Sequence, residues 1–195
     1  MKRPIILLMA YILLLALEML FLNKYINAFG PIILFAYILY IFWDDISSAD
    51  LNLLFKHKER WKTIYTYMKW TIIIQGLTNL LAQLVFGFAP MLTMQDLLIL
   101  TPIVAVICSP VIEEVIFRKL IFGYLNTKVG FWFAAIPSSI LFAVAHANYV
   151  GWLGFFLIGM FWSWIYKKTE SIMIPIILHT FLNTIVFVVL SIKGS

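Results

Sequence analysis

The residues in this sequence best suited to chemistry are two adjacent glutamates inside an apolar run. Glu113 and Glu114 lie between Ser109 and Arg118, in a segment that is otherwise hydrophobic enough to cross a membrane. An ionisable side chain in hydrocarbon costs several kcal/mol, so it is seldom kept there without a partner and a function. On a helix, Glu114 and Arg118 are four residues apart and can form an ion pair. Glu113 points about 100° away from Glu114 and is left for chemistry.

Two histidines and an asparagine lie in later apolar segments. Phe142 precedes His146 by one helical turn, and His179 precedes Asn183 by one turn on the same face. A single histidine on an apolar face is usually structural, but two histidines with an unpaired carboxylate and an amide favour a functional site. Counting about 1.5 Å per residue from the helix ends places both histidines and Glu113 near the middle of the membrane. We therefore expect these side chains to converge.

Such a constellation suits hydrolysis in a closed cavity. A carboxylate withdrawn from water is a stronger base than in solution, so Glu113 could activate a water molecule with the help of one histidine. The other histidine and the asparagine could donate hydrogen bonds to the oxyanion of a tetrahedral intermediate. Alternatively, Glu113, His146 and His179 could hold a zinc ion, with the glutamate as base. The zinc signature H-E-x-x-H is absent, so the residues leave the cofactor open between none and one Zn²⁺.

The composition shows what surrounds these residues. The chain has 195 residues, of which 64% are hydrophobic and 12% charged, and its mean hydropathy is +1.01. A soluble domain carries about 25% charged residues, so this is a polytopic membrane protein. The only cysteine, Cys108, lies in an apolar segment, which excludes a disulfide framework and a thiolate metal cluster. The net charge of +5 follows from membrane topology and does not indicate a nucleic acid partner.

The apolar segments predict an all-α bundle of about seven transmembrane helices. They cover approximately residues 5–22, 27–43, 64–88, 97–124, 131–147, 150–166 and 172–191. With the N-terminus inside, eleven lysines and arginines fall on the cytoplasmic side, Arg118 among them, and Lys24 and Lys193 fall outside. The positive-inside rule therefore predicts an N-in, C-out topology.

We predict one integral membrane domain over residues 1–195, with catalytic helices at about 97–191 and helices without motifs at about 1–96. The connection at 44–63 has serines followed by an apolar and then a basic run, which is typical of a short helix on the cytoplasmic leaflet. Three prolines, Pro110, Pro137 and Pro175, lie inside or at the start of spans, and each can kink its helix and free a backbone carbonyl near the polar residues. Glu18 is expected to be an interfacial residue beside Lys24.

The three motifs resemble the signature of the CAAX protease and bacteriocin-processing family of intramembrane endopeptidases, also called the Abi family. That signature is E-E-x-x-x-R, then F-x-x-x-H, then H-x-x-x-N, on successive membrane helices. The sequence offers, in this order and over about residues 101–190, Glu113-Glu114-x-x-x-Arg118, Phe142-x-x-x-His146 and His179-x-x-x-Asn183.

The resemblance implies a role for each matched residue. Glu113 and His146 would activate the water, and His179 and Asn183 would stabilise the oxyanion. Structural support of the site would come from Glu114, Arg118 and Phe142. The family is commonly described as metalloproteases, although a glutamate mechanism without metal is argued for its CAAX-processing members. The implied substrate is a membrane-anchored or hydrophobic peptide or protein, the setting is a bilayer, and the small size is similar to bacterial relatives in peptide maturation or self-immunity.

Two alternatives remain. A non-catalytic partner, such as a bacteriocin immunity or signalling factor, would keep the fold without proteolysis, and degenerate motifs would favour it. A proton-coupled transporter would use Glu113, Glu114 and the histidines as a relay and would carry an inverted repeat with paired broken helices. The motifs are intact and the sequence shows no such repeat, so an intramembrane endopeptidase of the bacterial cell membrane is the preferred hypothesis.

Overall fold

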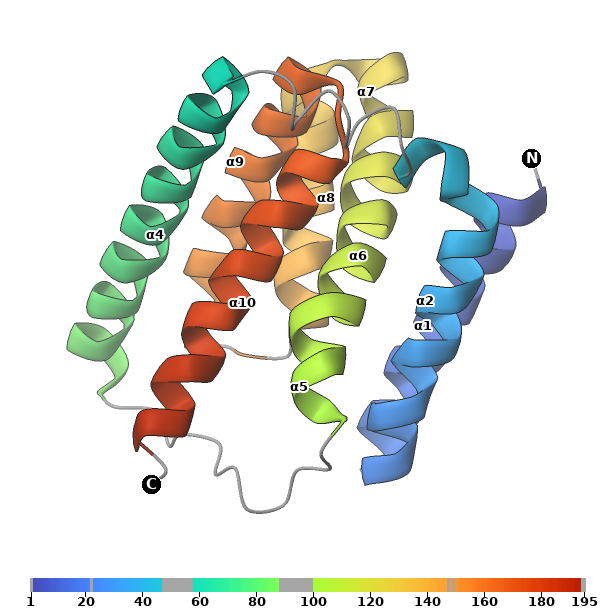
Figure 1. Cartoon of the computed structure of the whole chain (residues 1–195), viewed down its shortest axis with the longest axis horizontal. Helices are drawn as coiled ribbons and strands as arrows, with labels where there is room; N and C mark the ends of the chain where they lie inside the picture. Colours follow the sequence, from blue (N-terminus) through green and yellow to red (C-terminus); the bar gives the residue numbers. More distant parts are fainter. Residues whose placement is uncertain are drawn as a thin grey trace.

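The computed structural model describes residues 2–21, 23–46, 58–87, 100–146, 148 and 150–193. Over these residues the backbone is helical apart from short connections, and it forms no β-strand. The helices lie side by side and alternate in direction, and the two chain ends lie at opposite ends of the bundle (Figure 1). The all-α prediction is therefore confirmed, while the direction in which the bundle crosses the membrane stays a prediction.

The described residues form seven continuous helical segments, as the hydropathy pattern predicts. The fourth segment is a composite that runs without a break from residue 101 to residue 129. In chain order the elements are α1 (Lys2–Phe21), α2 (Lys24–Ile46), α4 (Lys58–Phe86), α5 (Thr101–Ile103), η2 (Val104–Cys108), α6 (Ser109–Glu113), η3 (Glu114–Phe122), α7 (Gly123–Val129), α8 (Phe131–Ala145), α9 (Trp152–Thr169) and α10 (Met173–Lys193).

Three of these helices, α1, α2 and α10, are long and apolar enough on their own to cross a membrane. Helix α8 is a shorter apolar helix. These helices confirm an integral membrane protein. The helix that the sequence predicts within residues 44–63 falls mostly outside the described residues, which resume at the start of α4.

The composite segment contains two π-helical stretches, η2 and η3, on either side of α6. In η2 the backbone N–H of Ser109 donates to the carbonyl of Val104, five residues earlier. The next donor in this register would be Pro110, which has no N–H, so the carbonyl of Ala105 is left without its helical partner. The side-chain amide of Asn183 donates to that carbonyl at 2.8 Å and so ties α10 to η2.

The first two helices join the core through one face each. Leu7 and Tyr11 of α1 and Ile38 of α2 are buried, and they belong to the same apolar cluster as residues of η3. The spacing of Leu7 and Tyr11 is one helical turn, as expected for a single inward stripe. The opposite face of α1 exposes large apolar side chains such as Leu13 and Leu20. A bilayer gives that face an apolar environment.

Helices α8 and α9 pack closely beside the composite segment. A Cβ added at Gly159 would lie 2.9 Å from the side chain of Ser139, so a larger residue could not take its place without a shift. The hydroxyl of Ser138 donates to the carbonyl of Phe117 at 2.7 Å and fixes α8 against η3. Before α8, Gly130 adopts φ 81°, a conformation that favours glycine, and it allows the chain to reverse.

One residue that the topology argument used lies elsewhere. Arg118 is only 1% exposed and is packed inside the bundle, so it is not a loop charge facing the cytoplasm. Without it, the count that favours the N-in orientation falls from eleven to ten against two. A count of ten against two still favours the N-in orientation. Arg118 instead compensates the buried charge of Glu114.

Candidate active site

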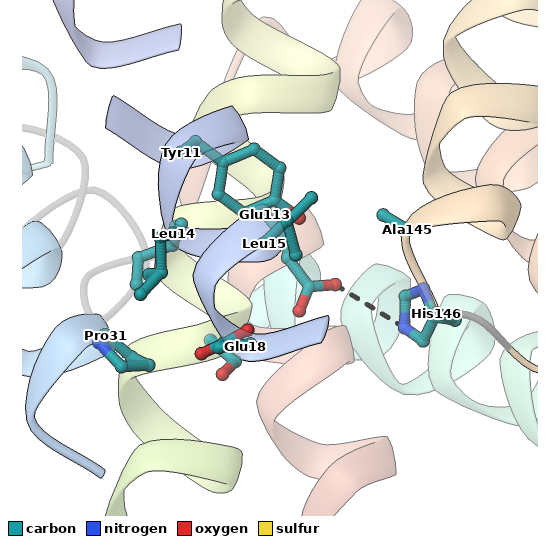
Figure 2. Close-up of a pocket in the computed structure, with 10 residues that line it drawn as sticks. Tyr11, Leu14, Leu15, Glu18, Pro31, Glu113, Ala145 and His146 are labelled. Carbon is teal, nitrogen blue, oxygen red and sulfur yellow. Dashed lines mark ion pairs between the residues drawn. The ribbon is translucent and has the colours of Figure 1, made fainter. Parts of the chain in front are cut away.

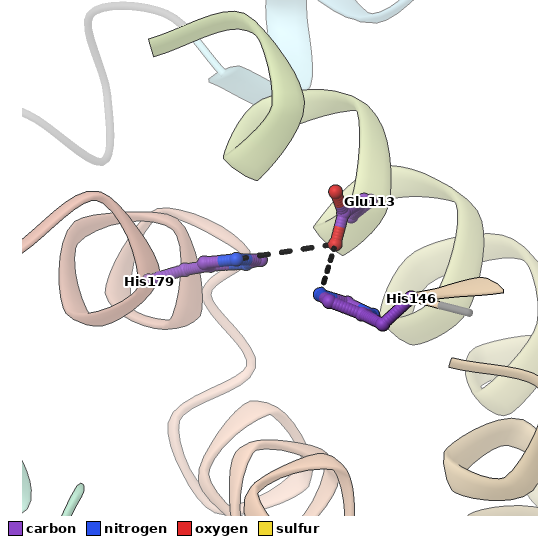
Figure 3. Close-up of side chains that lie close together, drawn as sticks. All are labelled: Glu113, His146 and His179. Atoms are coloured by element: carbon purple, nitrogen blue, oxygen red, sulfur yellow. Dashed lines mark ion pairs between the residues drawn. The ribbon is translucent and has the colours of Figure 1, made fainter. Parts of the chain in front are cut away.

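Three helices bring one side chain each to a common point (Figure 3). Glu113 Oε2, from the last residue of α6, lies 3.5 Å from Nε2 of His146, which directly follows α8. The same oxygen lies 3.9 Å from Nε2 of His179 on α10. Ligand-type atoms of all three residues lie within 4.8 Å of one another. The fold thus joins the three intramembrane residues that the sequence singled out.

The three side chains differ in accessibility. The side chains of Glu113 and His146 are 16% and 21% exposed, whereas that of His179 is 3% exposed. Glu113 Oε2 is itself shielded and accepts no hydrogen bond within the described part of the chain. Glu113 and His146 are therefore the members of the group that a water molecule can reach, and His179 is the most enclosed of the three.

Hydrogen bonds assign the tautomers of both histidines. His146 Nδ1 lies 2.8 Å from the carbonyl oxygen of Phe142, which can only accept, so this nitrogen carries a hydrogen. His179 Nδ1 lies 2.8 Å from Glu114 Oε1 and likewise donates. In the neutral imidazoles, both Nε2 lone pairs therefore face Glu113 Oε2. Three acceptors around one point call for a proton donor or a cation between them.

Behind this group lies a buried ion pair. Glu114 Oε2 lies 3.1 Å from Arg118 Nε, and the two side chains are 0% and 1% exposed. The Arg118 guanidinium carbon lies 4.1 Å from the ring centroid of Phe142 and 5.3 Å from that of Trp162, in cation–π geometry. Arg118 therefore compensates the charge of Glu114, whose other oxygen orients His179. Phe142 supports the pair from the side.

Aromatic rings hold the imidazoles in place. His146 stacks on Phe155, with ring centroids 3.9 Å apart and planes 27° apart. His179 lies against Trp162 with centroids 4.6 Å apart, and the Trp162 indole N–H donates to Thr71 Oγ1 of α4 at 3.2 Å. Sequence reasoning missed Phe155 and Trp162, because a chain with 17% aromatic residues gives no signal for two particular rings.

Asn183 lies one turn beyond His179 on α10, outside the group of three. One N–H of its amide is engaged by the Ala105 carbonyl, at 2.8 Å. The second N–H forms no hydrogen bond with any residue that the structure describes. Asn183 therefore ties α10 to η2 through one amide N–H, and its second amide N–H is left as a donor.

The group borders a cavity of about 150 Å³ that extends toward the first two helices (Figure 2). Glu113 and His146 line it together with Tyr11 and Glu18 of α1 and Pro31 of α2. The interfacial position expected of Glu18 stays a prediction, and α1 in addition turns this residue toward the cavity. Glu18 is the one charged residue between Arg3 and Lys24, and that isolation is the signal that could have identified it.

The group of three also fits a metal ion. One carboxylate and two imidazoles are the donors that catalytic zinc takes in several hydrolases, with a fourth position left for water. The nitrogen–oxygen separations of 3.5 and 3.9 Å suit donors that share one ion. The inward lone pairs of both Nε2 atoms are those that a ligand must present.

A helical membrane bundle with a Glu-His-His group beside a cavity defines a class, the polytopic membrane proteins that cluster ionisable side chains between their helices. Comparison with known proteins agrees with the resemblance that the motifs indicate. Residues 95–185 match the family model described as Type II CAAX prenyl endopeptidase Rce1-like. The predicted resemblance to the CAAX proteases is confirmed over these residues, which make up somewhat under half of the chain.

Bacterial relatives agree with that assignment. A protein named as a membrane peptidase, YdiL of Bacillus subtilis, is 40% identical over 86 residues, which is 44% of this chain and 35% of YdiL. The membrane-embedded CAAX protease MroQ of Staphylococcus aureus is 36% identical over 88 residues, covering 42% of this chain and 36% of MroQ. The UPF0177 protein YxdF of Lactococcus lactis is 33% identical over 79 residues, covering 40% of this chain and 42% of YxdF.

Each match thus spans well under half of the relative's length. No solved structure matches the chain.

Proposed function

We propose that the protein is an intramembrane endopeptidase that hydrolyses a peptide bond by direct attack of an activated water molecule. The observation that carries this proposal is the convergence of Glu113 Oε2 with the Nε2 atoms of His146 and His179 at the edge of a cavity. The Rce1-like family match and the relatives named as peptidases support it.

The chemistry begins with a water molecule between Glu113 and His146. It donates one hydrogen to the carboxylate and the other to His146 Nε2, which the Phe142 contact leaves as an acceptor. The water oxygen attacks the scissile carbonyl carbon while Glu113 takes up a proton. Glu113 then returns this proton to the departing amine as the C–N bond breaks, so that the carboxylate is restored and an acid and an amine are released.

The tetrahedral intermediate carries an oxyanion, for which His179 and Asn183 are the proposed donors. Asn183 supplies its second amide N–H. His179 donates from Nε2 in its imidazolium form, whose charge the Glu114 carboxylate stabilises through the 2.8 Å contact. Removal of one oxyanion donor costs about 10²–10³ in kcat in other hydrolases. Glu114 is thus a positioning residue that acts through His179.

The same site could instead work with a bound zinc ion. Glu113, His146 and His179 would hold it, and when bound it makes a coordinated water acidic enough to ionise near neutral pH. In this form both histidines are neutral ligands. The Glu114 carboxylate then accepts the Nδ1–H of His179 and fixes its orientation, as carboxylates commonly do for metal-bound histidines.

The proposed substrate is a hydrophobic or membrane-anchored peptide or protein that enters from the bilayer. The site lies between helices whose outer faces expose large apolar side chains, such as Ile136 and Leu141 on α8. The bacterial origin of the relatives supports a bacterial cell membrane, and the two that are named as a peptidase and a protease support a role in peptide processing. Bacteriocin processing is the narrower proposal, which rests on the sequence motifs alone.

The test is cleavage of acyl-anchored fluorogenic peptides by the purified protein in lipid nanodiscs. Native protein is compared with Glu113→Gln and His146→Ala, and Glu170→Gln in an exposed loop is the matched control. Loss of cleavage in the two site variants alone supports the proposal. Cleavage that survives a chelator indicates the metal-free form, and loss that Zn²⁺ restores indicates the zinc form.

Equal cleavage by native protein and both site variants would contradict the proposal. Absence of cleavage over a panel that includes peptides encoded beside the gene would favour a non-catalytic partner with the same fold.

A further inference from the structure

Helix α1 brings a second acidic residue to the cavity that the catalytic group borders. Glu18 lines it together with Glu113, and in Figure 2 both carboxylates lie beside the same space. Glu18 belongs to none of the three motifs. It forms no ion pair with any residue in the described ranges, and no lysine or arginine is among the residues that line the cavity. The cavity therefore has two acids and no fixed cation.

The nearest buried cation is not available to Glu18. Arg118 is engaged by Glu114 at 3.1 Å and is covered by the rings of Phe142 and Trp162. Two carboxylates in a cavity of low dielectric focus a negative potential there, which favours an occupant that carries positive charge. A carboxylate within a membrane span also calls for a partner in its own right.

Glu18 is set apart from the reacting group. In the described structure its carboxylate is not among the ligand-type atoms that gather within 4.8 Å around Glu113. The cavity of about 150 Å³ that Glu18 and Glu113 both line has room for one long side chain. Leu14 and Leu15 of α1 line the same cavity and offer an apolar wall to an aliphatic stem. Lysine and arginine side chains combine such a stem with a charged tip.

We propose that Glu18 forms a specificity subsite for a lysine or arginine side chain of the substrate, next to the bond that is cleaved. The proposal rests on the endopeptidase function above and adds the substrate chemistry. The aliphatic stem lies against the leucines of α1, and the cationic tip pairs with the Glu18 carboxylate. The scissile carbonyl remains at Glu113 and His146. Helix α1, outside the matched family region, thereby selects the substrate.

The first experiment measures selectivity with acyl-anchored fluorogenic peptides. At each position flanking the cleaved bond, lysine is compared with norleucine, which has a similar length and no charge. At one position the native protein should prefer lysine by about tenfold or more in kcat/KM, the size of a charge-assisted contact. In Glu18→Gln this ratio should fall to near one, and in Glu18→Lys glutamate should replace lysine as the preferred residue. Glu170→Gln, an exposed control, should keep the native ratio.

A second experiment measures binding of a cation at the subsite without relying on catalysis. The thermal unfolding midpoint of the protein in nanodiscs is measured with 1-hexylammonium and with 1-hexanol, which partition near the same depth but differ in charge. The amine should raise the midpoint more than the alcohol in the native protein and in Glu113→Gln, and this difference should vanish in Glu18→Gln.

The two experiments separate the two proposals. If no peptide is cleaved but the amine stabilises the protein through Glu18, the endopeptidase proposal fails and the cationic subsite stands. If cleavage depends on Glu113 but lysine and norleucine are cut equally, or if Glu18→Gln keeps the preference, the subsite is overturned. Equal loss of cleavage for all peptides in Glu18→Gln also overturns it, because a selective contact cannot act on a substrate that lacks the cation.

Discussion

The two halves of the bundle bury very different side chains. Residues 101–193 contain Glu114, Arg118 and His179, all of them nearly inaccessible, whereas the buried polar side chains described in residues 2–86 are the hydroxyls of Thr71 and Thr78. In line with this, 39% of the α10 span is buried and only 11% of the α1 span. The buried charged side chains thus lie where several helices surround them and supply their partners. Helices α1 and α2 contribute residues to the wall of the cavity beside the site.

This contrast explains which half is recognisable from sequence. The reacting half must supply fixed residue types at fixed helical spacings, so its motifs can be read without a structure. The first half needs only apolar surface and a few polar residues that line the cavity. Many different sequences meet this requirement. The family match accordingly begins at residue 95. The following predictions test the division, beginning with the largest effect.

The most severe effect is expected from Glu113→Gln, which keeps the size of the side chain and removes the base. Because general acid–base catalysis by a positioned side chain contributes about 10²–10⁴, kcat should fall by a factor in this range with the fold intact. Single-turnover cleavage in nanodiscs measures it, with circular dichroism as the check on folding. Activity within a factor of about three of native would remove Glu113 from the proposed mechanism.

Arg118→Met should cause the largest loss of stability. It leaves the Glu114 carboxylate buried without its cation, and the loss of one member of a buried ion pair costs about 3–5 kcal/mol. The free energy of unfolding in a detergent titration measures this loss, with Lys128→Met on an exposed face as control. The double variant Glu114→Gln with Arg118→Met should recover part of the stability. No recovery would show that Arg118 acts through packing on Phe142 and Trp162.

Asn183→Leu should have an intermediate effect, because it leaves the Ala105 carbonyl without a donor. An unsatisfied buried acceptor costs about 1–3 kcal/mol. In a Pro110→Ala background, a backbone N–H becomes available to this part of the helix, so the same substitution should cost less. Unfolding free energies of the four proteins form a double-mutant cycle, and strict additivity would rule out the shared carbonyl.

The smallest effect is expected in the first half of the chain. Thr71→Val removes the acceptor for the Trp162 indole N–H with little change in volume. Hydrogen bonds between membrane helices contribute about 0.6 kcal/mol on average, so stability should fall by about that amount. Cleavage should change less than for any of the three preceding variants. A loss of more than about 2 kcal/mol would mean that α4 supports the site as strongly as the second half does.

The sequence predicts the existence and order of the helices well, because seven apolar stretches separated by charged connections admit few other arrangements in a membrane. The ends are less predictable. Helix α2 covers 24–46 rather than 27–43, and its start is fixed by Asn23, whose side chain accepts from the Tyr25 N–H at 2.8 Å. Hydropathy alone does not detect a polar cap of this kind.

The site was predictable where residue type implies function. Glu113, His146 and His179 are ionisable groups in hydrocarbon, and the structure brings them within a few ångströms of one another. Glu18 and Trp162 depend instead on how a helix is rotated about its axis. That rotation is set by packing among several helices, for example by the close contact of Gly159 with Ser139. A local pattern in one chain does not contain this information.

The hydrogen bond between Asn183 and Ala105 bears on how the molecule is made. The two partners are 78 residues apart, so the composite helix is synthesised and can enter the bilayer before its partner on α10 exists. Until then the Ala105 carbonyl lacks this donor, and an unsatisfied buried acceptor costs about 1–3 kcal/mol. Packing of α10 supplies the missing donor and also brings His179 to Glu113. The proposed active site is thus completed only when a late helix arrives, and the group of Glu113, His146 and His179 does not exist before that moment.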